Sequence, residues 1–174
     1  MELADWAVHA VDHMQRELQR DPRWSKSFSA ELIATRTVHL AVFVEPFLTF
    51  VLQGKKSIES RFSTRQCAPF RRVSIGDIVL LKEASGPVRG ICEVAKTWYF
   101  DLESVPLADV RERFADGICA TDDAFWRARE KADYATLLKL RSVRAVSPIR
   151  CPKRDRRGWV VLPNPKEQLA LPLS

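Results

Sequence analysis

The chain has 174 residues, of which 46% are hydrophobic and 29% charged, with a net charge of +6; this composition is typical of one globular domain and excludes a largely disordered chain. No apolar run approaches the roughly 20 residues that span a bilayer, and the acidic start of the chain lacks the features of a signal peptide. We therefore expect a cytoplasmic protein that makes no contact with a membrane.

An amphipathic helix is predicted over residues 3–19, because apolar residues recur there at helical spacing. The Asp-Pro pair at residues 21–22 ends it. Residues 1–36 are therefore expected to form an N-terminal helix and a connector outside the main domain. The apolar stripe of this helix must be buried somewhere, so one interpretation is that it binds a protein partner.

The main domain is predicted to begin with a strand over residues 37–44, which are rich in β-formers. Pro46 favours a short helix after it, because proline is preferred at the first helical position. Gly54 is suited to end that helix, since glycine readily adopts a left-handed conformation. A second strand is predicted over residues 57–62.

In the second half of the chain, predicted strands and helices alternate less regularly. Residues 63–76 have no periodic pattern, and a loop of this length in a compact domain is usually functional or mobile. The remaining predicted elements are strands over residues 78–81, 88–100, 138–149 and 158–162, and helices over residues 107–114 and 122–132. This order lacks the strict strand–helix alternation of a doubly wound sheet. The sequence therefore predicts an α+β fold, a small and mostly antiparallel β-barrel decorated by helices over residues 37–163, with a loose tail over residues 164–174.

Basic charge is concentrated in two segments of this sequence. Residues 55–72 carry a net charge of +5 and residues 139–157 carry +7, so the rest of the chain carries −6. Clustered lysine and arginine form the electrostatic footprint expected for a polyanion, most often nucleic acid. The alternative is a solvated basic face that has no ligand.

Neither the cysteines nor the histidines of the chain predict a metal site or another cofactor. The cysteines are Cys67, Cys92, Cys119 and Cys151. They form no Cys-x-x-Cys pair, so we expect buried or unreactive thiols rather than zinc or redox chemistry. His9 and His13 are four residues apart on the predicted N-terminal helix, but no third ligand accompanies them.

The densest group of charged residues lies between the short helix and the second strand. Arg61 offers a planar fork that pairs with phosphate through two hydrogen bonds. Lys56 supplies a point charge or, if desolvated, a base or nucleophile with a lowered pKa. Glu59 could orient Lys56, act as an acid or base, or accept the amino group of a nucleobase. The alternative is a structural ion pair, which contributes about 0–1 kcal/mol when exposed.

Other residues are candidates for additional contacts with nucleic acid. Trp98 and Tyr99 could stack on bases, and the tract over residues 153–157 could contact phosphates. The predicted nucleic-acid-binding residues are Lys55, Lys56, Ser57, Glu59, Arg61, Arg65, Arg71, Arg72, Trp98, Tyr99, Lys153, Arg154, Arg156 and Arg157. If the protein is an enzyme, the predicted catalytic residues are Lys56 and Glu59.

The sequence around the charged group resembles the ASCH domain family, which belongs to the PUA-like superfamily of small β-barrels. The family hallmark G-x-K-x-x-E-x-R is matched by Gly54, Lys56, Glu59 and Arg61. A proline-led helix precedes the hallmark, and a Gly-Asp pair that enters an apolar strand follows it. The resemblance extends over about residues 37–162.

The resemblance implies a cleft beside the barrel that is lined by the hallmark side chains and binds RNA or a nucleotide. Some members of the family are hydrolases: one group removes the acyl group from N4-acetylcytidine, and another has ribonuclease activity. The amidohydrolases use a lysine, a threonine and a glutamate. Lys56 matches the lysine, but Glu59 occupies the threonine position, and the segment near residues 117–119 offers Asp116 and no glutamate. RNA binding is therefore the first hypothesis, and a hydrolase acting on RNA or a modified nucleoside is the alternative.

Overall fold

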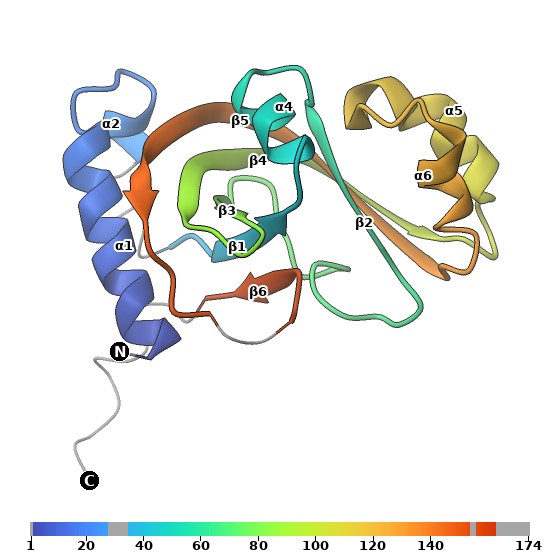
Figure 1. Ribbon diagram of the computed structural model, residues 1–174, viewed down its shortest axis with the longest axis horizontal. Helices are drawn as coiled ribbons and strands as arrows, with labels where there is room; N and C mark the ends of the chain where they lie inside the picture. The colour runs from blue at the N-terminus through green and yellow to red at the C-terminus, as the bar shows by residue number, and fades with distance from the viewer. Residues whose placement is uncertain (1, 28–34, 154–155, 163–174) are drawn as a thin grey trace, which may run out of the picture.

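The structure is a computed structural model that describes residues 2–27, 35–153 and 156–162 (Figure 1). Its strands are β1 (Val38–Phe43), β2 (Ile58–Ser63), β3 (Ile78–Glu83), β4 (Val88–Asp101), β5 (Tyr134–Ile149) and β6 (Trp159–Val161). Its helices are α1 (Leu3–Leu18), α2 (Trp24–Ser27), α4 (Phe47–Leu52), α5 (Leu107–Ile118) and α6 (Asp123–Arg127). The predicted tail over residues 164–174 lies outside the described residues.

The strands form one curled, six-stranded sheet in the order β2-β5-β4-β3-β1-β6 (Figure 1). Neighbouring strands are antiparallel except β1 and β3, which are parallel. Helix α1 lies against one end of the curled sheet, and α5 and α6 lie at the other end (Figure 1). The prediction of a mostly antiparallel α+β fold is therefore confirmed.

Strand β5 and helix α6 depart from their predicted bounds. The strand begins at Tyr134 rather than at residue 138, and the helix ends at Arg127 rather than at residue 132. The first part of β5 is buried on both faces, since Ala135 and Leu137 pack toward α5 while Leu138 packs in the core beneath α4. A strand covered on both faces lacks the alternation of apolar and polar residues that reveals a half-exposed strand.

Helix α1 docks on the sheet of its own chain. Trp6 and Met14 are almost fully buried and belong to one core cluster with Leu40 of β1. The Trp6 indole also donates a hydrogen bond to the carbonyl of Arg150, at 2.6 Å. Because the apolar stripe of α1 is already covered, the expectation that it binds a protein partner is wrong.

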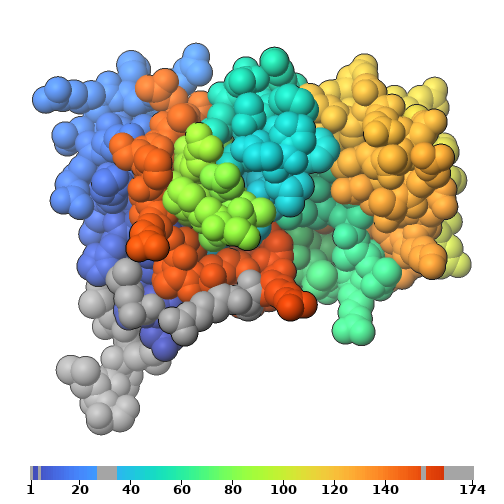
Figure 2. Space-filling view, in the orientation of Figure 1, coloured from blue at the N-terminus to red at the C-terminus, as the bar shows by residue number. Residues whose placement is uncertain are grey.

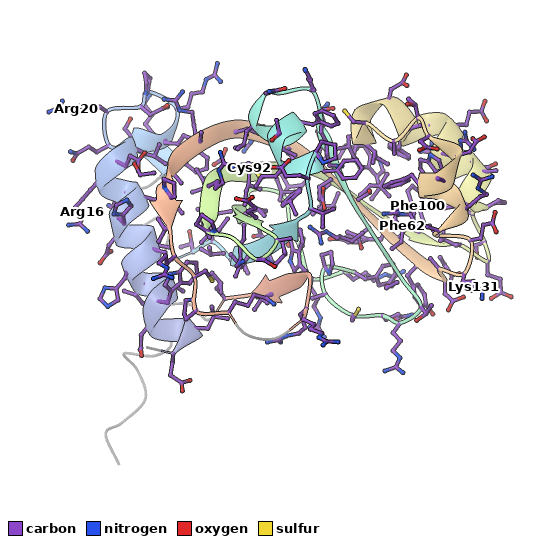
Figure 3. The ribbon with its side chains drawn as sticks, in the orientation of Figure 1. Arg16, Arg20, Phe62, Cys92, Phe100 and Lys131 are labelled. Atoms are coloured by element: carbon purple, nitrogen blue, oxygen red, sulfur yellow. The ribbon has the colours of Figure 1, made fainter. Side chains whose placement is uncertain are left out.

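The polar face of α1 points away from the sheet; Arg16, and Arg20 in the turn after the helix, project outward (Figure 3). His9 and His13 are exposed on the same helix. Across the described ranges, no three histidine, cysteine or acidic side chains are grouped as metal ligands would be. None of the helices in these ranges is both long enough and apolar enough to cross a bilayer.

The four cysteines are free thiols. Cys92 is completely buried in β4, and burial raises the pKa of its thiol far above the ordinary value. This cysteine is therefore an apolar core residue, as predicted, and holds its proton at neutral pH.

Candidate functional site

The turn that follows α4 carries Lys56 into the interior. Gly54 has a φ of +74°, a left-handed conformation that costs glycine little. The chain then reverses, and the backbone N–H of Lys56 donates to the carbonyl of Phe50 at 3.0 Å. The next N–H, that of Ser57, donates to the carbonyl of Gly117 at the end of α5, also at 3.0 Å. Lys56 is thus held between α4 and the C-terminal end of α5.

The ammonium group of Lys56 is buried and fully bonded. Its Nζ donates to the carbonyl oxygens of Ile58, at 2.7 Å, and Ile118, at 3.1 Å. It also lies 3.3 Å from Oε2 of Glu59. An ammonium has three N–H donors, and here two of them bond to carbonyls while Glu59 pairs with the charge. Only 3% of the Lys56 surface is exposed.

Glu59 joins Lys56 to Arg61. Its second oxygen, Oε1, lies 2.7 Å from Nε of Arg61, in an ion pair whose Nε–H is not aligned for a hydrogen bond. The two Nη atoms of Arg61 donate to the carbonyls of Val42, at 2.8 Å, and Gly158, at 3.2 Å. The three head groups therefore converge. Arg61 also links β2, at one edge of the sheet, to β1 and the residue before β6, at the other.

A cavity of about 460 Å³ opens beside these residues, a volume in the range of small-molecule sites. In the space-filling view, β2 is visible between α4 and α6, which flank this cavity (Figure 2). Its charged lining residues are Lys56, Glu59, Arg61 and Arg129, and its aromatic ones are Phe43, Phe47, Phe62 and Phe125. Three cations and one carboxylate give the lining a net charge of +2.

The α6 side of the cavity was not predicted from the sequence. The guanidinium carbon of Arg129 lies 3.4 Å from the centre of the Phe125 ring, and its Nη1 donates to the Phe125 carbonyl at 2.6 Å. Phe62, on the side of β2 that faces α6, lies 6.3 Å from the Phe125 ring (Figure 3). The spacing of Phe125 and Arg129 signals a contact on one helical face, but not which strand that face meets.

Several predicted contact residues lie outside the cavity lining. Lys55 is exposed, and Ser57 Oγ lies 3.0 Å from Nζ of Lys139, which donates a hydrogen bond to it. Trp98 packs against α5, and the Tyr99 hydroxyl donates to a backbone carbonyl in the loop before β3. Both rings are half-buried and packed against the protein, so they do not form a stacking surface at the cavity.

The predicted basic contacts lie on two loops. The loop between β2 and β3 exposes Arg65, Arg71 and Arg72, and the segment before β6 carries Lys153, Arg156 and Arg157. Arg154 lies outside the described residues. Gly158 follows the second segment directly and accepts a hydrogen bond from Arg61, so this segment ends beside the cavity.

Burial is the main influence on the pKa of Lys56 and lowers it from the ordinary value. The Glu59 carboxylate opposes this shift, and the Arg61 guanidinium adds to it. Burial likewise lowers the pKa of Arg129, and Glu59 opposes that change. The single carboxylate therefore acts on cations from both sides of the cavity.

We expect the free energy of unfolding of the wild type to rise relative to that of Lys56→Met as the pH rises toward the ordinary lysine pKa of about 10.4. In this range the unfolded chain binds more protons at Lys56 than the folded chain, so raising the pH favours folding, by less than about 1.4 kcal/mol per pH unit. Urea unfolding of both proteins from about pH 7 to pH 10 measures this. Lys131→Met removes an exposed lysine as the control, and a pH-independent difference for Lys56→Met would contradict the expectation.

No family model matches the sequence, and a comparison with curated proteins finds no match. Among solved structures, the fold is similar to that of ASCH from Zymomonas mobilis, with a TM-score of 0.58 and 15% sequence identity over 75% of this chain and 91% of that chain. A serine-to-alanine variant of the same protein gives a TM-score of 0.59 and 16% identity over 77% of this chain and 94% of that one. At this identity the likeness is one of fold. The chain therefore has an ASCH-like fold of the PUA-like type, as the hallmark residues predicted.

Proposed function

We propose that this protein binds RNA, with one unpaired nucleotide held in the cavity beside β2. The observation that carries the proposal is the convergence of Lys56, Glu59 and Arg61 on a cavity that also has four aromatic walls. Guanidinium groups pair with phosphate, and aromatic rings provide apolar surface for a base. The hallmark shared with ASCH domains supports the same assignment.

The two basic loops extend this proposal beyond the cavity. The segment before β6 ends beside Arg61, and the loop between β2 and β3 presents Arg71 and Arg72 to solvent. Contacts of this kind hold a strand in place without reading its sequence. A strand with one nucleotide in the cavity would therefore continue over these loops.

Titration of a fluorescein-labelled single-stranded RNA at increasing salt concentration tests the proposal. We expect the logarithm of the binding constant to fall linearly with the logarithm of salt, with a slope of about −0.7 per contacted phosphate. The double substitution Arg71→Gln/Arg72→Gln should make that slope less steep, because fewer phosphates are contacted. Arg16→Gln/Arg20→Gln, which replaces an outward-facing arginine of α1 and one in the turn after it, is the matched control and should leave the slope unchanged. A wild-type affinity that does not respond to salt would contradict RNA binding.

A hydrolase is the second candidate, favoured by the burial of Lys56 and the lowering of its pKa. The segment around residue 118, where the resemblance places a third catalytic group, does reach Lys56, but it supplies the Ile118 carbonyl rather than a carboxylate. Incubation with N4-acetylcytidine and with RNA tests this candidate. Turnover that is lost in Lys56→Met supports it, whereas no turnover, or equal turnover in both proteins, removes it.

A further inference from the structure

Hydrogen-bond capacity differs sharply among the three cations of the cavity. Lys56 has three N–H donors; two bond to the carbonyls of Ile58 and Ile118, and the buried ammonium is paired with Glu59. It could contact a ligand only by giving up one of these buried bonds. Lys56 therefore positions Glu59 and contributes charge, but it has no donor to offer a phosphate.

Arg61 retains part of its capacity. A guanidinium has five N–H donors. In Arg61, Nε forms an ion pair with Glu59, and one N–H on each Nη donates to a backbone carbonyl. One N–H on each Nη remains, and guanidinium N–H groups of this kind pair with phosphate oxygens.

Arg129 has the largest unused capacity. Within the described part of the chain, its hydrogen bonding consists of one bond, from Nη1 to the Phe125 carbonyl. Its guanidinium stacks on the Phe125 ring at 3.4 Å, which fixes the plane of the group without using a donor. The Phe62 ring, 5.5 Å from the guanidinium carbon, restrains it from the side of β2. Arg129 is thus a preorganised cation with four free N–H donors.

We propose that Arg129 is a phosphate-binding residue and that it holds the phosphate of the bound nucleotide together with Arg61. This inference rests on the proposed function and deepens it, because it names the chemical group that the cavity recognises and adds a residue outside the ASCH hallmark. Arg61 belongs to β2 and Arg129 follows α6, and both line the same cavity. The phosphate is either an internal phosphodiester or the terminal phosphate of a strand or mononucleotide.

The experiment compares Arg129→Ala with Arg113→Ala. Arg113 is an exposed arginine that also packs over aromatic rings, 5.0 Å from Phe114, but it lies on α5 outside the cavity lining. The two substitutions remove the same charge and the same kind of ring contact. We expect Arg129→Ala to weaken binding of single-stranded RNA about 10- to 100-fold, the effect of losing hydrogen bonds to a charged group. Arg113→Ala should change the affinity less than about threefold.

The probes identify the source of the phosphate. One RNA is used with a 5′-hydroxyl, with a 5′-phosphate and with a 3′-phosphate, and cytidine and cytidine monophosphate serve as competitors. If Arg129→Ala lowers the affinity equally for all three RNAs, the bound group is an internal phosphodiester. If it lowers the affinity only for the RNA with one phosphorylated end, the bound group is that terminal phosphate. Cytidine should compete equally well against the wild type and Arg129→Ala, whereas cytidine monophosphate should compete better against the wild type.

The outcomes separate this inference from the proposed function. If the wild type binds RNA and Arg129→Ala binds it equally well, or if Arg113→Ala causes the same loss, Arg129 is not a phosphate-binding residue, although RNA binding stands. If the wild type does not bind RNA, the proposed function is wrong, and the inference that rests on it is wrong as well. Should Arg129→Ala not fold, Arg129→Met keeps an unbranched side chain over Phe125 without the charge and takes its place.

Discussion

Replacing Glu59 by methionine should lower the free energy of unfolding by about 3–5 kcal/mol, the cost of leaving a buried charge without its partner. Glu59 is 4% exposed and provides the carboxylate that pairs with both Lys56 and Arg61. Methionine has a similar length and is unbranched, so little of the loss would come from an empty cavity. Lys56, itself only 3% exposed, would keep two carbonyl partners but lose its counter-charge.

The double variant Lys56→Met/Glu59→Met separates charge from packing. Removing both members of a buried ion pair is often neutral or stabilising, whereas removing one is costly. We therefore expect the double variant to recover at least about half of the stability lost in Glu59→Met. Glu83→Met, which removes a half-exposed partner 3.6 Å from Arg89, should cost about 0–1 kcal/mol. Equal urea midpoints for Glu59→Met and Glu83→Met would show that the converging charges do not support the fold.

The part of the site that could be predicted is local in sequence. Glu59 and Arg61 are two residues apart on a strand, so alternation alone places them on one face. Gly54 ends α4 with the left-handed conformation expected of it, and the turn brings Lys56 beside the same strand. The convergence of these side chains could be predicted because they are close in sequence and because helix ends and strands have regular geometry.

The rest of the site depends on contacts between distant segments. Phe125 and Arg129 reach the cavity because α6 packs on Phe62 of β2, and no local pattern specifies that pairing. The bonds that use up the donors of Lys56 come largely from backbone carbonyls, which every residue possesses. The sequence therefore identified Lys56 as a cation, but it could not show that Lys56 has no donor left for a ligand.

The docking of α1 could be read only in part. Its helical period was clear from the sequence, but the surface that covers the apolar stripe belongs to residues such as Leu40 and Ile91, far along the chain. An amphipathic stripe shows that a face is buried and does not show what buries it. The indole of Trp24, in α2, donates a further hydrogen bond to the carbonyl of Ser142, at 2.8 Å, which the sequence pattern does not predict.

Arg61→Lys keeps the charge but should lower both the stability of the protein and its affinity for RNA. The planar fork of Arg61 reaches the carbonyls of Val42 and Gly158 while its Nε faces Glu59, and the compact ammonium of lysine cannot span all three. We expect a loss of about 1.5–3 kcal/mol in the free energy of unfolding, because hydrogen bonds to a charged group are lost. RNA affinity should fall about 10- to 100-fold, since the two remaining guanidinium N–H donors are lost as well.

Two measurements on Arg61→Lys distinguish a structural from a ligand-binding role. Urea unfolding reports the link between β2 and the opposite edge of the sheet, and fluorescence anisotropy on the folded protein reports RNA binding. Arg89→Lys, an exchange within an exposed ion pair, should change neither by much. A destabilised Arg61→Lys with wild-type RNA affinity would assign Arg61 to the sheet alone. If Arg61 both supports the sheet and binds RNA, the same excess of RNA should raise the Tm of the wild type more than that of Arg61→Lys, because stabilisation by a ligand grows with the logarithm of its concentration divided by Kd.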